Sequence, residues 1–158
     1  MRWKTAVAIA TVSVLCSIGI LQAAEVGGPE AEKDLQKFQG TWVMVSGERD
    51  GKSAADEHVV VSRLVYKGNG GLLIVPNQHH EPIIFEIVKL DTTKKPNEMH
   101  FIRRSGPHAG KTIIAIYEFD GDHQYKFAFD PTGSATLKEF ATKEGTGHIR
   151  NTWKRAKP

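Results

Sequence analysis

The sequence predicts an all-β domain: an antiparallel up-and-down barrel of about eight strands after a short N-terminal helix. Short apolar segments recur along the chain, and turn signals such as Asp-Gly and Asn-Gly separate them. Within these segments apolar and polar residues alternate with a period of two, which turns one face of each strand toward a core. A meander of this kind closes into a barrel because closure removes exposed strand edges. With 158 residues, of which 40% are hydrophobic, the chain is long enough for one such domain.

The first residues differ in composition from the rest. Arg2 and Lys4 precede an uncharged run over 5–21, and small residues follow it. A charged start, an apolar run and a small-residue site are typical of a secretory signal peptide. We therefore expect residues 1–24 to be a cleaved signal and the protein to be periplasmic or extracellular. An uncleaved N-terminal anchor is the alternative.

Cleavage would change the composition that bears on function. It removes Cys16, the single cysteine, so the exported chain has neither disulfides nor a thiol nucleophile. It also removes Arg2 and Lys4 from a net charge of +3. A nearly neutral domain gives no electrostatic argument for nucleic acid. We expect no membrane span after cleavage.

The next segment leads into the barrel. Residues 25–33 are predicted to be a flexible lead-in, because they contain two adjacent glycines and a proline, and 34–158 to be the barrel domain. A short helix is expected over 30–38, with acidic residues early and Lys37 late. Leu35 and Phe38 give it one apolar edge, which is too narrow for a core helix but sufficient for a lid.

The strands are bounded by turn signals. Gly121 supplies the positive φ of a tight hairpin turn, and the two clearest strands flank it within 111–129. The segment 135–142 is not counted, because Leu137 and Phe140 fall on opposite faces and an up-and-down barrel needs an even number of strands. The strands expected are 41–47, 59–67, 72–75, 83–90, 99–104, 111–119, 124–129 and 148–154.

Alternation also predicts which residues fill the barrel. A large set of bulky side chains in an eight-stranded barrel leaves little empty volume. We therefore expect at most a shallow pocket toward the mouth, with Asn151 and Ser62 among its lining groups. The inward set is Met44, Leu64, Tyr66, Phe85, Ile87, Met99, Phe101, Tyr117, Phe119, Tyr125, Phe127, Phe129 and Trp153.

Gly40-Thr41-Trp42, after the short helix, resembles the G-x-W signature of lipocalins. With Asp50-Gly51-Lys52, Lys95-Pro96 and Ile116-Tyr117-Glu118 in this order, the chain is similar to a family of small, mostly uncharacterised secreted lipocalin-like domains of planctomycete bacteria. The resemblance covers about 34–155. It implies a calycin-type barrel whose Trp42 plugs the closed end, with Arg155 packed on the indole. It implies no activity.

The fold analogy favours a non-catalytic carrier with a small apolar ligand at the barrel mouth. The alternative is a structural or protein-interaction module of the cell envelope, whose barrel is filled by its own side chains. In either case we expect a monomer. The candidate ligand-binding residues are Ser62, Tyr66, Phe85, Phe101, Tyr117, Phe127 and Asn151.

Histidines gather in the loops expected at the barrel end opposite Trp42. Imidazole is the commonest ligand for zinc and copper, so His79, His80 and His108 form a candidate metal set. The alternative is that they are solvated loop residues, because no HExxH motif, paired cysteine or acidic cluster accompanies them. No G-x-S-x-G elbow is present either, and we expect neither an enzyme nor a cofactor. The pair Arg103-Arg104 is interpreted as a solvated edge.

Overall fold

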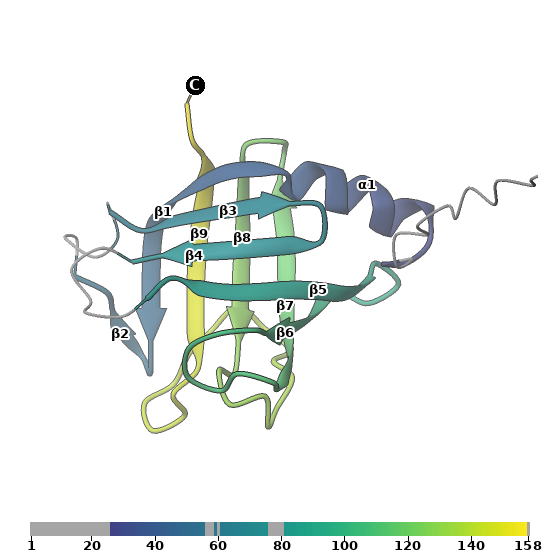
Figure 1. Ribbon diagram of the computed structural model, residues 1–158. Coiled ribbons are helices and arrows are strands. Elements are labelled where there is room, and N and C mark those ends of the chain that lie inside the picture. The colour runs from purple at the N-terminus through teal and green to yellow at the C-terminus, as the bar shows by residue number, and fades with distance from the viewer. Residues whose placement is uncertain (1–25, 56–58, 60, 76–80, 158) are drawn as a thin grey trace, which may run out of the picture.

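The computed structural model describes residues 26–55, 59, 61–75 and 81–157. Within these ranges no helix is long and apolar enough to span a membrane. The chain forms one helix and nine strands in the described ranges (Figure 1). They are α1 (Pro29–Phe38), β1 (Gly40–Arg49), β2 (Lys52–Ser53), β3 (Arg63–Lys67), β4 (Gly70–Ile74), β5 (Ile83–Asp91), β6 (Asn97–Arg103), β7 (Thr112–Asp120), β8 (Gln124–Phe129) and β9 (Ile149–Arg155).

Eight of these strands form a closed antiparallel barrel, which confirms the predicted lipocalin-like fold class. From β3 to β9 each strand pairs with the next, and β1 pairs with both β3 and β9 to close the sheet. Strand β2 is a two-residue addition that pairs with the end of β1. Figure 1 shows β3, β4 and β5 running across β7, β8 and β9 behind them, with β1 curving from one set into the other. A bulge between Met44 and Ser46 accompanies this curvature, because a bulge bends the strand that carries it.

The barrel interior contains the residues that alternation places there. Every member of the predicted inward set belongs to one hydrophobic core; Met44 and Phe119 are partly buried and the others are buried. The start of the second expected strand, 59–67, needs a correction. Strand β3 begins at Arg63 instead of residue 59, because the backbone turns at Ser62, whose N–H donates to the carbonyl of Val59.

Helix α1 closes one end of the barrel and reaches further inward than a lid. Phe38 is 0% exposed, and its ring centroid lies 4.7 to 5.2 Å from those of Tyr66, Tyr117, Phe119 and Tyr125. Such tilted and edge-on contacts between aromatic rings stabilise the core beyond the burial of their surface. The last residue of the helix is therefore a central part of the barrel core.

The predicted flexible lead-in over 25–33 is wrong. The helix already begins at Pro29, and Val26 is buried in the barrel core. The carbonyl of Val26 accepts a hydrogen bond from the N–H of Leu90 at 2.8 Å. This segment is held against the end of β5 by a contact that is remote in sequence, which glycine and proline content alone does not reveal.

Trp42 and Arg155 close the same end, as the resemblance implies. The indole N–H of Trp42 donates to the carbonyl of Phe38 at 2.7 Å. The guanidinium of Arg155 lies 4.4 Å from the centre of the indole ring. It also donates to the carbonyls of Lys37, Gln39 and Asp122. The indole and the guanidinium therefore both form hydrogen bonds. The guanidinium binds carbonyls at the end of α1, where the last carbonyls of a helix have no partner within the helix.

The segment 135–142 is not a strand, in agreement with the prediction, and it packs on the outside of the barrel. Leu137 is buried against Ile116 of β7 and Ala128 of β8, with Phe140 beside them. This small second cluster explains why two outward-facing strand positions are apolar. Leu137 and Phe140 both contact this cluster, although strand alternation would place them on opposite faces.

Candidate binding site at the barrel mouth

Two connected cavities lie at the end of the barrel away from α1. The inner cavity has a volume of about 50 Å³ and the mouth cavity about 420 Å³. The residues that line both are Leu73, Ile83, Arg103, Phe129 and Asn151. These shared walls make the two cavities one site that opens outward.

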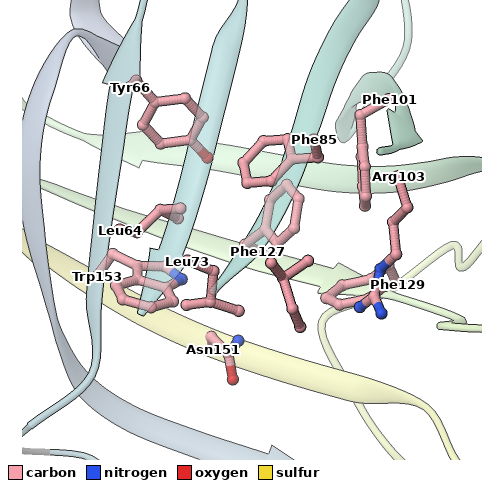
Figure 2. A pocket seen from close by; sticks show the side chains of 11 residues that line it. Leu64, Tyr66, Leu73, Phe85, Phe101, Arg103, Phe127, Phe129, Asn151 and Trp153 are labelled. Atoms are coloured by element: carbon pink, nitrogen blue, oxygen red, sulfur yellow. The ribbon is translucent and has the colours of Figure 1, made fainter. Parts of the chain in front are cut away.

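The inner cavity is enclosed mainly by aromatic and aliphatic side chains (Figure 2). Trp42 lines neither cavity, so the site does not extend to the closed end. The expectation of a shallow pocket toward the mouth is confirmed, and the barrel is filled below it. The lining residues of the inner cavity are Leu64, Tyr66, Leu73, Ile83, Phe85, Phe101, Arg103, Phe127, Phe129, Asn151 and Trp153.

Five of the seven candidate ligand-binding residues lie in this cavity: Tyr66, Phe85, Phe101, Phe127 and Asn151. They come from β3, β5, β6, β8 and β9, so the barrel brings together residues far apart in sequence. Their alternation in each strand turns them inward, where they line one cavity.

The other two candidates lie elsewhere. The hydroxyl of Tyr117 donates to the Asp34 carboxylate at 2.8 Å, at the closed end under α1. Burial, and then Asp34, raise the pKa of Tyr117 well above its usual range. Ser62 is buried but lines neither cavity, and its carbonyl accepts from the N–H of Met44. Alternation predicts that both side chains point inward but gives no information on their height along the barrel axis.

The sequence interpretation missed Leu73 and Ile83 of this site and, among its buried residues, the charged Arg103. It is only 8% exposed, whereas Arg104 is exposed and pairs with Glu86 at 2.6 Å. The solvated-edge interpretation is therefore right for Arg104 and wrong for Arg103. Met99, Phe101 and Arg103 follow one another at a spacing of two, so the strand pattern contained the signal.

The guanidinium of Arg103 is held but incompletely bonded. Its Nη1 donates to the carbonyl of Pro107 at 2.8 Å, while its Nε has no partner in the described part of the chain. Burial, and then the nearby charge of Arg49, lower the pKa of Arg103 from its usual value. The residue is thus a buried cation at the junction of the two cavities, close to a second cation.

Trp153 provides a second unbonded donor in the inner cavity. It is 1% exposed, and its Nε1 has no hydrogen-bond partner in the described ranges. Figure 2 shows the indole nitrogen on the edge of the ring nearest Leu73, with the Arg103 guanidinium at the other side of the view. The hydroxyl of Tyr66, which also lines the inner cavity, already has a hydrogen-bond partner, the hydroxyl of Tyr125 at 3.3 Å.

The mouth cavity adds more charged groups. Arg49, His108 and Glu81 line it together with Arg103. His79 and His80 lie outside the described residues, so the proposed metal set stays a prediction. Within the described ranges there is no group of three or more His, Cys, Asp or Glu residues placed to hold a metal ion.

Taken together, these walls are suited to hold a small molecule. The inner cavity is largely apolar, and the polar residues Arg103 and Asn151 lie where it joins the mouth, a composition typical of a small-ligand pocket. Comparison with known proteins found no matching family model, no matching curated protein and no matching solved structure. The likeness to the secreted lipocalin-like domains stays a prediction.

Proposed function

We propose that this protein is an exported, non-catalytic lipocalin-like domain that binds a small apolar molecule at the barrel mouth. The observation that carries the proposal is the mouth cavity of about 420 Å³, which continues into an aromatic inner cavity. Its volume lies in the lower part of the roughly 300–1,000 Å³ typical of ligand pockets. The inner cavity, at about 50 Å³, holds only a small group. The body of the ligand therefore lies in the mouth.

Two adjacent residues of β5 provide the test. Ile83 lines both cavities, whereas Ile84 is 49% exposed on the outer face. We expect the neutral probe N-phenyl-1-naphthylamine to bind with increased fluorescence. Ile83→Trp fills the site and abolishes this binding, while Ile84→Trp leaves it unchanged. Melting temperatures of both variants verify folding, and Ile83→Phe replaces the first variant if it does not fold.

Equal binding by wild type and Ile83→Trp would contradict a ligand site at the mouth. Native mass spectrometry of protein purified from its source organism then gives an independent answer. A co-purifying molecule that Ile83→Trp loses supports the proposal and identifies the ligand.

A structural or protein-interaction role in the cell envelope is the second candidate. It is favoured by the filled barrel below the inner cavity and by exposed apolar residues on the outside, Val45, Ile84 and Val88. If no apolar probe binds, while Ile84→Trp disrupts an association that Ile83→Trp preserves, this role replaces the first.

Export is supported by the charged start and apolar run of residues 1–24. Intact-mass measurement of the mature protein should give an N-terminus near Glu25. Cell fractionation should find the protein outside the cytoplasm, and size-exclusion chromatography should show a monomer. A mass that includes Met1 would contradict cleavage.

A further inference from the structure

The unbonded polar atoms of the barrel belong to two residues of the same cavity. Of the buried side-chain nitrogen and oxygen atoms in the described part of the chain, only Arg103 Nε and Trp153 Nε1 have no hydrogen-bond partner. Both residues line the inner cavity. Both atoms are donors, so the complementary ligand group is a hydrogen-bond acceptor. Buried polar groups are normally bonded, and two exceptions in one cavity require an explanation.

The positive charge of Arg103 indicates that the acceptor group of the ligand is an anion. A buried arginine is normally paired with an acid. In the described ranges no carboxylate forms an ion pair with Arg103. Glu81 lines the mouth cavity without pairing with Arg103, and the charge that lowers the pKa of Arg103 is the like charge of Arg49, which lines the same cavity. A bound anion would compensate both cations, whereas a neutral acceptor would compensate neither.

The side chain of Arg103 is also fixed in position. Its Nη1 is bonded to the carbonyl of Pro107, and its backbone N–H and carbonyl pair with Lys111 and Gly110. A guanidinium held in this way loses little conformational freedom when it binds an anion. Arg103 lines both cavities. An anionic group bound beside it therefore leaves the volume of the mouth cavity free for the apolar part of the ligand.

We infer that the ligand is a small apolar acid, whose anionic group pairs with Arg103 at the junction of the cavities and whose hydrocarbon part lies in the mouth. The inference rests on the proposed function and specifies the ligand class of the same site. Trp153 Nε1 provides a second donor deeper in the cavity.

Octanoate and 1-octanol are the probes, since they share an alkyl chain and differ in charge. Titration calorimetry at pH 7.5 measures both against wild type, Arg103→Met and Arg104→Met. Arg104 is the matched control because it is adjacent in sequence but exposed and paired with Glu86. We expect octanoate to bind wild type at least about tenfold more tightly than octanol, the difference that a charge-assisted hydrogen bond provides. Arg103→Met should remove that difference, and Arg104→Met should retain it.

The outcomes separate the two proposals. If octanol binds wild type as tightly as octanoate, or if Arg103→Met and Arg104→Met have equal effects, the acid is the wrong ligand class while the apolar site stands. If neither probe binds, the proposed function fails and the inference fails with it. Should Arg103→Met not fold, Arg103→Gln removes the charge with a polar side chain and must show the same loss. Trp153→Phe should lower octanoate affinity by less than Arg103→Met if the anion lies nearer the guanidinium.

Discussion

The closed end and the inner cavity of the barrel each contain a tryptophan and an arginine, and the two pairs differ in their hydrogen bonds. At the closed end, Trp42 donates to the carbonyl of Phe38 and Arg155 donates to three carbonyls. In the inner cavity, Trp153 Nε1 and Arg103 Nε have no partner in the described part of the chain. An unbonded buried donor destabilises the fold by about 1–3 kcal/mol. The bonded groups of the closed end therefore stabilise the fold, whereas the inner cavity retains unsatisfied groups of the kind that a ligand can bind.

The strongest test of this contrast is the loss of the closing tryptophan. Trp42 is fully buried and contacts Phe119 and Tyr125 as well as Arg155. Trp42→Ala should lower the free energy of unfolding by about 3–5 kcal/mol, the range for deleting a large buried aromatic. Urea denaturation measures it. A loss below about 1 kcal/mol would show that the closed end does not hold the barrel together.

A glycine beside the inner cavity tests how tightly the open half is packed. A Cβ atom on Gly71 would lie 2.0 Å from Phe85 Cζ, whereas one on Gly70 would be 3.4 Å from its nearest neighbour, the carbonyl oxygen of Lys67. Gly71→Ala should displace the Phe85 ring, destabilise the protein by about 1–3 kcal/mol and weaken probe binding. Gly70→Ala is the control and should change both properties much less. Equal effects would mean that the open half repacks freely.

The tyrosines report on the closed half as a function of pH. All three in the chain, Tyr66, Tyr117 and Tyr125, are buried, and burial raises each pKa above its usual value near 10. The neutral phenols contribute full stability below about pH 10. Above it the unfolded chain ionises first, so stability is lost as pH rises. Absorbance at 295 nm should therefore increase only together with the loss of the near-ultraviolet circular dichroism. Phenolate formation in a still-folded protein would contradict this packing.

The fold was more predictable than the site, for a physical reason. Alternation gives the face of a strand, and it placed Phe85, Phe101 and Phe127 inside correctly. It does not give height along the barrel, which depends on strand tilt and register, so Tyr117 was grouped with residues that line the cavity. Arg103 was missed because two adjacent arginines were interpreted together, although neighbours in a strand point to opposite faces.

Other features depend on contacts between distant parts of the chain. The bond between Val26 and Leu90 cannot be inferred from the glycines near Val26. The cover that Leu137 provides over Ile116 is likewise invisible to strand periodicity. Trp42 and Arg155 were paired correctly because closure of an even barrel returns the last strand to the first.

The smallest expected effect on stability is that of replacing Arg103, compared with the replacement of Arg155. It distinguishes a role of Arg103 in ligand binding from a role in the fold. Arg155→Met leaves the carbonyls of Lys37 and Gln39 without their donor, and partial exposure lets water replace it, so we expect a loss of about 1–2 kcal/mol. Arg103→Met also removes one bond, to Pro107, but it relieves the burial of an unpaired cation. The ligand-free variant should therefore be as stable as wild type or slightly more stable in urea denaturation. A destabilisation equal to that of Arg155→Met would mean that Arg103 supports the fold, and the contrast between the closed end and the inner cavity would then no longer point to a ligand.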